Sequence, residues 1–427
     1  MYNWNTLLSG YLHPRLFAVL FLGFSSGLPY GMLMDPFNFW LSESGVSRAV
    51  IGLMSLIILT YSLKAIWTPF IDRLKIPVLS KSLGTRKSWL LISQITVTLT
   101  LLGLATCDPK QSISIMIGLA LAVAFSSATQ DICVDAMRIE LLTEKQLGQG
   151  AAMYQGGWRL AFLCTQVITF LIASRFDWST AYSVAAITMA VIAVITMLSV
   201  PEPLEVERDH ISLLHKPKTW FKTSYLTPFL DIAKRYTNRI YLILLLVLSY
   251  RFSDFILGPM AMPFYQETGF TKDQIALITN AFGISVSLAG AFIGGLLVYR
   301  YSTIVALSIG ASLVALTNLT FAALALIGND ILALTIVIIC DNLAQGVATA
   351  ALIAYLSSLT TEKFTATQYA LLFLLATLPA RFIASSSGFV VDAVGYFNFF
   401  IYAALMGLPA IFISLYFWKK EKNSILS

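Results

Sequence analysis

The sequence predicts an all-α polytopic membrane protein with twelve transmembrane helices in two six-helix bundles, and three observations lead to that prediction. Of the 427 residues, 57% are hydrophobic and only 12% are charged, and the mean hydropathy is +0.78. Soluble domains usually carry about 25% charged residues, so a single water-soluble globule is excluded. The other two observations are a series of twelve apolar stretches and a similarity between the two halves of the chain.

The apolar stretches are each about as long as a helix that crosses a bilayer, which needs about 20 residues. Charged residues or Gly, Pro and Asn clusters separate them. They predict spans at 16–40, 49–70, 88–106, 112–137, 149–173 and 179–200, and then at 240–262, 274–298, 303–327, 331–357, 368–390 and 396–418.

The basic residues predict the orientation of these spans. Twenty Lys and Arg residues lie in the N-terminal segment, the even-numbered loops and the C-terminal segment, whereas the opposite loops hold four: Arg48, Lys110, Arg175 and Lys272. Because basic residues accumulate in cytoplasmic loops, both termini are expected in the cytoplasm of a multi-pass protein of the bacterial inner (plasma) membrane. The net charge of +6 is then explained by topology, and no nucleic-acid partner is expected.

The longest polar stretch divides the chain into an N-terminal bundle (1–200), a cytoplasmic linker (201–239) and a C-terminal bundle (240–427). The segments 40–53 (WLSESGVSRAVIGL) and 264–277 (FYQETGFTKDQIAL) align without gaps, and each follows the first span of its half. Two repeated six-helix halves joined by a long loop resemble the architecture of major facilitator transporters, which bind substrate near the bilayer midplane.

Ionisable residues inside the spans are candidate functional residues, because a charge in the membrane is costly. The acids are Asp35, Asp131, Asp135, Asp254 and Asp341, and the bases are Lys64, Arg159, Arg251 and Arg381. Asp131 and Asp135 are four residues apart, on one helix face, where mutual repulsion favours uptake of a proton by one of them. Alternatively, either acid pairs with Arg73 or Arg86 and forms a structural gate.

Arg251 and Asp254 are three residues apart in span 7, so they are able to pair and partly cancel their charges. Lys64 lies within about two turns of the inner end of span 2, where its side chain is expected to extend to the interface. The alternative for each of these groups is a direct role in transport.

Arg159 and Arg381 lie near mid-depth in opposite halves and have no partner nearby in the sequence. A guanidinium group suits a carboxylate or a phosphate, which makes both arginines candidate ligands for an anionic substrate. The alternative is an acid on another helix, Asp131 for Arg159 and Asp341 for Arg381.

The sequence gives no indication of a cofactor, a metal site or catalysis. The three histidines lie in polar segments, the four cysteines lack metal-ligand spacing, and there is no phosphate-binding loop. Proton coupling, if present, depends on carboxylates. A transporter is therefore expected rather than an enzyme, and a membrane enzyme or a receptor is the third hypothesis.

Several segments resemble the AmpG-type anhydromuropeptide permeases of the major facilitator superfamily. In the first half these are FLGFSSGLPYG (21–31), SSATQDICVDAMRIELL (126–142) and GAAMYQGGWRLAF (150–162). In the second half they are YRFSDF (250–255), DNLAQGVATAALIAYL (341–356) and FTATQYALLFLLATLPARF (364–382). The resemblance extends in order over nearly the whole chain.

This resemblance implies import of disaccharide-linked anhydromuramyl peptides by proton symport, as part of peptidoglycan recycling. Together with the buried charges it assigns candidate roles. The proton-coupling candidates are Asp131, Asp135, Asp254 and Asp341, and the substrate-binding candidates are Arg159, Arg251, Arg381, Gln130, Asn342, Tyr154 and Trp158. The two aromatic residues are able to stack on sugar rings, although aromatic side chains also serve as membrane anchors.

Five residues between spans 2 and 3 resemble the superfamily's loop motif, which acts as a conformational latch: Asp72, Arg73, Gly84, Arg86 and Lys87. Family members often continue through two further spans, whereas this chain ends at Ser427. MDPFNFW also brings Asp35 into span 1, where it would repel an anionic substrate. The alternative cargo is therefore another metabolite, such as an acyl-CoA, a nucleotide or a small peptide. We expect a monomer.

Overall fold

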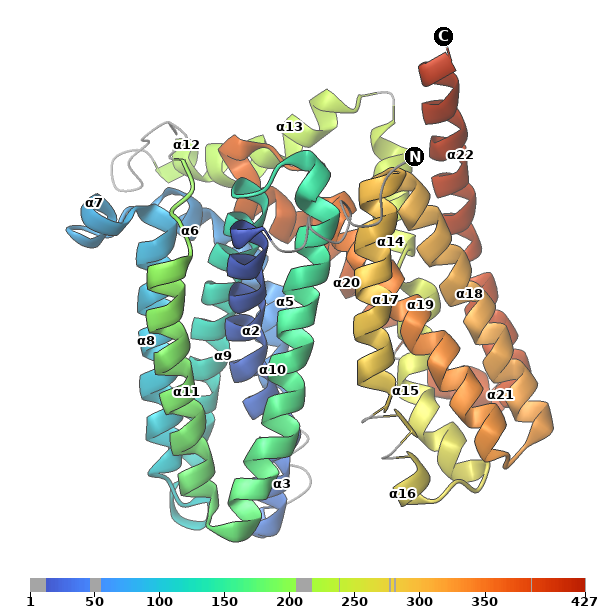
Figure 1. Ribbon diagram of the computed structural model, residues 1–427, viewed down its shortest axis with the longest axis horizontal. Helices are drawn as coiled ribbons and strands as arrows, with labels where there is room; N and C mark the ends of the chain where they lie inside the picture. The colour runs from blue at the N-terminus through green and yellow to red at the C-terminus, as the bar shows by residue number, and fades with distance from the viewer. Residues whose placement is uncertain are drawn as a thin grey trace. The chain divides into compact units, whose positions relative to one another are not determined.

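The computed structural model describes residues 13–46, 55–204, 217–237, 239–275, 278–279, 282–384 and 386–426. These residues form helices and include no strand (Figure 1). Ten helices or helix pairs are long and apolar enough to cross a membrane, which matches ten of the twelve predicted spans. The other two predicted spans, 49–70 and 274–298, lie partly outside the described residues; the second includes the shorter apolar helix Ser285–Arg300.

The helices group into two compact units. Unit 1 consists of residues 1–143, 153–229 and 360–370, and unit 2 consists of residues 144–152, 230–359 and 371–427. Two short segments, 144–152 and 360–370, therefore pack with the unit other than the one expected from their place in the sequence. The predicted boundaries at residues 200 and 239 otherwise remain a prediction.

Unit 1 contains most of the helices of the first half. They are α2 (Pro14–Leu33), α3 (Asp35–Glu43), η1 (Ser55–Ile58), α5 (Leu59–Leu63), η2 (Lys64–Ile66), α6 (Thr68–Arg73), α7 (Leu79–Leu83), α8 (Thr85–Ala105), α9 (Pro109–Glu140), α10 (Leu147–Arg175), α11 (Trp178–Ser199), α12 (Pro217–Phe221) and the π-helical η4 (Lys222–Leu226). A short 3-10 turn, η3 (Glu144–Gln146), precedes α10.

Unit 2 contains most of the helices of the second half. They are α13 (Thr227–Arg235), α14 (Ile240–Ser249), α15 (Phe252–Glu267), α16 (Lys272–Ile275), α17 (Gly283–Arg300), α18 (Thr303–Ile327), α19 (Ile331–Ser358), η6 (Glu362–Phe364), α20 (Thr365–Ala384), α21 (Ser387–Leu405) and α22 (Leu408–Leu426). Residues 227–229 of α13, η6 and the first turn of α20 group with unit 1.

The internal repeat has a structural counterpart where α3 and α15 end. Gly45 and Gly269, which align in the two halves, both have positive φ angles, of 81° and 93°. The residue after each glycine donates its backbone N–H to a carbonyl five residues earlier, from Val46 to Leu41 at 3.0 Å and from Phe270 to Tyr265 at 3.1 Å. A left-handed glycine with this hydrogen bond is a common helix C-cap, so both helices end in the same way. Residues 47–53 and 276–277 of the aligned segments lie outside the described residues.

Glycines allow close helix contacts in both units. A Cβ atom on Gly157 of α10 would lie 2.0 Å from the Leu20 carbonyl oxygen of α2, and one on Gly346 of α19 would lie 2.2 Å from the Ser287 carbonyl oxygen of α17. Membrane helices gain van der Waals contact where small residues let their backbones approach. Glycine at these two positions therefore lets α10 approach α2 and α19 approach α17 closely.

Candidate functional site

A buried cluster of charged side chains lies within unit 1, between η2 and α9. Lys64 Nζ is 2.8 Å from Asp135 Oδ2, and the two side chains are 9% and 6% exposed. Arg138, one turn after Asp135 on α9, places Nη2 3.7 Å from Asp135 Oδ1. Each charge has a partner close by, as buried charges require.

This cluster corrects two predictions. Lys64 does not extend to the interface, because its ammonium group is the ion-pair partner of Asp135. The gate in which Asp131 or Asp135 pairs with Arg73 or Arg86 is also wrong among the described residues. Arg86 pairs with Asp72 and Glu140 instead, and Arg73 donates to the hydroxyl and the carbonyl of Thr223. Sequence spacing identified the two acids on α9, but the base that neutralises one of them comes from a different helix.

Asp131 lies one turn before Asp135 and has a different environment. Its carboxylate accepts a hydrogen bond from the Ser26 hydroxyl of α2, and no ion pair reaches it among the described residues. The Ser26 hydroxyl also lies 3.3 Å from the Tyr154 hydroxyl of α10. The two neighbouring acids are therefore distinct, because Asp135 has basic partners whereas Asp131 has a hydroxyl partner.

Arg138 is a residue whose importance sequence reasoning missed. The sequence predicts it just beyond the span at 112–137, among the twenty basic residues that set the topology, yet it is fully buried on α9. Its guanidinium carbon lies 5.5 Å from the centre of the Tyr154 ring and 5.1 Å from that of Tyr369. The available signal was its spacing, because positions 131, 135 and 138 fall on one face of a helix.

Two further candidates in unit 1, Trp158 and Arg159, belong to an aromatic group on α10. The Trp158 ring stacks on Phe162 at a centroid distance of 5.4 Å and an interplanar angle of 7°, and it lies 5.4 Å from Tyr30. Arg159 places its guanidinium carbon 5.7 Å from the Trp158 ring centre. Gln130 lies apart from this group, because it is fully buried and donates to the Ser25 hydroxyl at 3.3 Å.

In unit 2, the pair predicted from spacing is present. Arg251 Nη1 lies 3.0 Å from Asp254 Oδ2 and also donates to the Thr349 hydroxyl of α19 at 3.2 Å. The other Asp254 oxygen accepts from the Gln345 amide of α19, a residue that the sequence analysis did not single out. Arg251 occupies the break between α14 and α15, where its backbone leaves the helical region with φ −97° and ψ 1°.

Asp341 and Asn342 are neighbours on α19 but have separate partners. The Asp341 carboxylate accepts from the Thr317 hydroxyl of α18 at 3.3 Å, and Asn342 donates within its own helix to Ile338 at 3.0 Å. Arg381 is exposed on α20, and no ion pair to Asp341 is found among the described residues. The alternative in which these two residues neutralise each other is therefore wrong in this structure.

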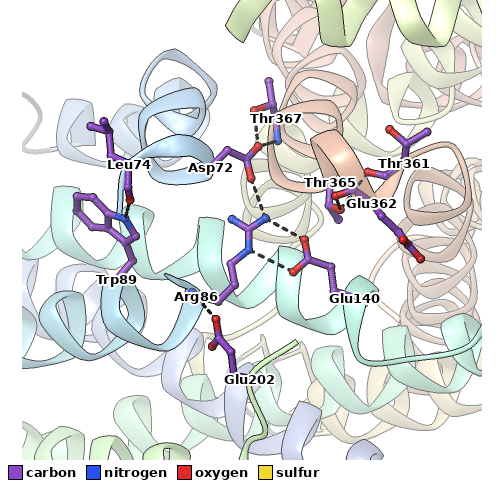
Figure 2. Close-up of polar contacts among 10 residues, drawn as sticks. All are labelled: Asp72, Leu74, Arg86, Trp89, Glu140, Glu202, Thr361, Glu362, Thr365 and Thr367. Carbon is purple, nitrogen blue, oxygen red and sulfur yellow. Dashed lines mark hydrogen bonds and ion pairs between the residues drawn. The ribbon is translucent and has the colours of Figure 1, made fainter. Parts of the chain in front are cut away.

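Figure 2 shows two of the five predicted latch residues, Asp72 and Arg86, with three further groups that join them, Glu140, Glu202 and Thr367. Arg86 Nη2 lies 2.7 Å from Asp72 Oδ1 and 2.8 Å from Glu140 Oε1. The second Asp72 oxygen accepts from both the backbone N–H and the hydroxyl of Thr367, at 2.8 and 2.5 Å, near the start of α20. A carboxylate at a helix N-terminus is favoured by the unpaired backbone N–H groups there.

Gly84 and Lys87 contribute to the predicted latch through their backbone atoms. Glu202 accepts from the backbone N–H groups of Arg86 and Lys87 at 2.8 and 2.9 Å, and burial raises the pKa of its carboxyl although these bonds oppose the shift. Gly84 has φ +85°, and a Cβ there would lie 2.3 Å from the Glu202 side chain. Only glycine fits this turn, because both the backbone conformation and the space exclude a side chain.

Comparison with known proteins places the chain among membrane transporters. The family model of the Major Facilitator Superfamily matches residues 16–250 and 243–426. The chain is 34% identical to "Putative transporter AmpG 4" of Rickettsia conorii over 94% of this chain and 96% of that one. It is 28% identical to "Anhydromuropeptide permease" of Escherichia coli over 94% of this chain and 79% of that one.

Solved structures share the fold at low sequence identity. The human organic anion transporter MFSD10 has a TM-score of 0.73 and 16% identity, over 94% of this chain and 99% of its own. The proton:xylose symporter XylE has a TM-score of 0.64 and 13% identity, over 98% of this chain and 96% of its own. The chain therefore belongs to the major facilitator superfamily and, within it, to the AmpG-type permease family.

Proposed function

We propose that this transporter imports anhydromuropeptides from periplasm to cytoplasm by proton symport, as a step in peptidoglycan recycling. The relative named "Anhydromuropeptide permease" supports the cargo. The uneven distribution of Lys and Arg supports an inner-membrane location with both termini in the cytoplasm. The proposed coupling mechanism rests on the different partners of Asp131 and Asp135.

Asp131 is the proposed proton-binding group of unit 1. Its neighbour Asp135 has compensating charges in Lys64 at 2.8 Å and Arg138 at 3.7 Å, whereas Asp131 has the Ser26 hydroxyl. A carboxylate that forms no ion pair is stabilised by protonation when water is excluded. Binding of a proton therefore favours the closed surroundings of Asp131, and its release favours a conformation in which the group reaches water.

Asp341 is the corresponding candidate in unit 2, because it has the Thr317 hydroxyl rather than a base as its partner. Asp254 is held by Arg251 and Gln345 and is the weaker of the two candidates. Asp135 and Asp254 then have a supporting role, in which each keeps a neighbouring base in position.

The substrate-binding proposal rests on the arginines and on the aromatic group of α10. A muropeptide combines sugar rings with peptide carboxylates, and guanidinium groups bind carboxylates in a fork geometry. Arg159 and Arg381 are the arginines that we assign to this role, and the Trp158–Phe162 stack offers an aromatic face for a sugar. Arg251 is a weaker candidate, since Asp254 already neutralises much of its charge.

The cluster of Asp72, Arg86 and Glu140 is proposed as the conformational latch, together with Arg73, Gly84 and Lys87. Asp72 joins α6 to the start of α20 through Thr367. Breaking these bonds frees both helix ends at once, so the cluster is suited to hold one conformation until substrate and proton have bound.

The test is uptake of a labelled anhydromuropeptide into proteoliposomes with an imposed inside-negative potential and an acidic exterior. The Asp131→Asn variant is expected to lose accumulation while still binding the substrate. Glu144→Gln serves as the matched control, because Glu144 lies exposed in the short turn before α10. Accumulation at the wild-type level by the Asp131→Asn variant would exclude Asp131 as the obligatory proton carrier. Uptake by the wild type that does not change with the proton gradient would exclude symport.

One observation favours the alternative hypothesis, in which the cargo is another metabolite. Asp35 is exposed at the first position of α3, directly after the break in span 1 at Met34. Competition of the labelled muropeptide by an acyl-CoA, a nucleotide or a small peptide distinguishes the cargos. Asp35→Asn is expected to increase affinity for an anionic substrate, whereas an unchanged affinity would indicate that Asp35 lies away from the bound cargo.

A further inference from the structure

The linker between the two halves contains a continuous helical segment, 217–235, made of α12, η4 and α13. Residues 217–229 belong to unit 1 and carry two lysines and no acid. In Figure 1, α12 lies at the same end of unit 1 as α6 and α7. No residue of this segment belongs to the proposed proton-binding or substrate-binding sites. The composition of its exposed face therefore needs an explanation of its own.

One face of this segment is attached to unit 1. Trp220 is buried and its ring lies 4.7 Å from that of Phe70 on α6. Tyr225 donates its hydroxyl to the Ile66 carbonyl, and Arg73 donates to the Thr223 carbonyl at 2.5 Å. These contacts fix the rotation of the helix about its axis, so the opposite face is directed away from unit 1.

The opposite face is both apolar and basic. Phe221, Leu226 and Phe229 are 61%, 45% and 45% exposed, and Lys218 and Lys222 are exposed beside them. Positions 218, 222, 226 and 229 are three or four residues apart and lie along one side of a helix. Large apolar side chains together with lysines are typical of helices that lie in the surface of a bilayer.

The depth of the segment agrees with such a location. Ile66, whose carbonyl accepts the Tyr225 hydroxyl, lies in the predicted second span and its side chain is 58% exposed. Ile66 is four residues before the end of that predicted span (49–70), so the tyrosine bonded to it lies near the end of the span as well. The helix therefore lies at the end of a span, at the level of the headgroups.

We propose that the exposed face of residues 217–229 binds the bilayer surface, with Phe221, Leu226 and Phe229 among the upper acyl chains and Lys218 and Lys222 on anionic phospholipid headgroups. The proposal follows from charge complementarity, because basic side chains without an acid nearby attract anionic lipid. It depends on the membrane location of the chain and not on the identity of the cargo.

Hydrogen exchange of the full-length protein in lipid nanodiscs tests this assignment, with neutral phosphatidylcholine discs compared with discs that contain phosphatidylglycerol. Amide exchange in 217–229 is expected to be slower in the anionic discs. Each lysine removed is expected to weaken the protection roughly 5-fold, so Lys218→Gln with Lys222→Gln abolishes most of it. Phe221→Ser with Leu226→Ser is expected to remove protection in both kinds of disc.

Lys110→Gln is the matched control, because it removes one exposed lysine at the N-terminus of α9. Its exchange in 217–229 should equal that of the wild type. Equal exchange of the wild type in neutral and anionic discs would overturn the role of anionic lipid. Protection that persists in both double variants would overturn the assignment to this face and favour a protein contact instead.

Discussion

Unit 1 and unit 2 hold their buried acids in different ways. In unit 1, Asp135 on α9 is neutralised by Lys64 from another helix, at 2.8 Å. In unit 2, Asp254 is neutralised by Arg251, three residues earlier in the chain, at 3.0 Å. The first ion pair joins two separate segments, whereas the second is local. An ion pair between helices stabilises their packing, and a local pair mainly compensates its own charge.

The two units also share a feature. Among the four proton-coupling candidates, each unit has one acid with a basic partner and one acid whose described partner on another helix is a hydroxyl, namely Asp131 with Ser26 and Asp341 with Thr317. The comparison therefore separates charges that support the structure from charges that are available for a proton. Substitutions in the two classes should have different consequences.

The largest expected effect is that of Lys64→Met. Removing the ammonium group leaves Asp135 buried with only the more distant Arg138, and breaking a buried pair from one side usually costs about 3–5 kcal/mol. Thermal or denaturant unfolding in detergent measures the loss, with Lys110→Gln as the control. Lys64→Met combined with Asp135→Leu is expected to recover most of the stability, and a single variant as stable as the wild type would show that the pair is not structural.

A second test concerns the close helix contacts. Gly157→Ala in unit 1 and Gly346→Ala in unit 2 each force a methyl group against a backbone carbonyl, at a cost of about 1–3 kcal/mol. Gly118→Ala is the matched control, because nothing lies within 4 Å of the added atom. The control should be neutral or stabilised by up to about 1 kcal/mol. Equal stability of all three variants would mean that these contacts can relax.

Arg251→Met should cost less than Lys64→Met, about 1–2 kcal/mol, because Asp254 keeps its bond to Gln345 and the pair is partly exposed. The two variants are compared in one unfolding series. A cost for Arg251→Met as large as that for Lys64→Met would remove the distinction between a local pair and one that joins helices.

The smallest expected effect is that of Glu202→Gln. Because burial raises the pKa of Glu202, the folded state binds the proton more tightly than the unfolded state, so this group lowers stability as pH rises through its usual range. The variant stays neutral at every pH, so near neutral pH its stability is expected to lie within about 1 kcal/mol of the wild type, because relief of the buried charge offsets the loss of one acceptor for the two backbone N–H groups. Unfolding between pH 4 and pH 7 should depend less on pH than in the wild type, and an unchanged slope would contradict this role.

Sequence reasoning succeeded where the physical rule is local. Hydropathy located ten spans that the structure describes as long apolar helices, because a bilayer imposes both the length and the composition of a spanning helix. The three-residue spacing of Arg251 and Asp254 predicted their ion pair, since one helix turn brings them together. The gapless alignment of the halves was matched by the two glycine caps at residues 45 and 269.

Sequence reasoning failed where partners come from different helices. The sequence predicts Lys64 at the interface and Arg138 in a loop, and it offers Asp341 as an alternative partner of Arg381. In the structure Lys64 and Arg138 are buried around Asp135, and Arg381 is exposed. The hydropathy of a residue describes its own transfer from water, but a buried charge is tolerated or excluded according to the charges that packing brings near it.

Composition, periodicity and ordered motifs are properties of the chain alone, and they are enough to identify a helical membrane transporter of a known family. Which of its buried acids have basic partners depends on how the helices pack. Asp131 and Asp135 are indistinguishable by spacing, yet Lys64 reaches one and Ser26 the other. The physical reason is that electrostatic compensation depends on distances of a few ångström between helices, which packing sets and residue order does not.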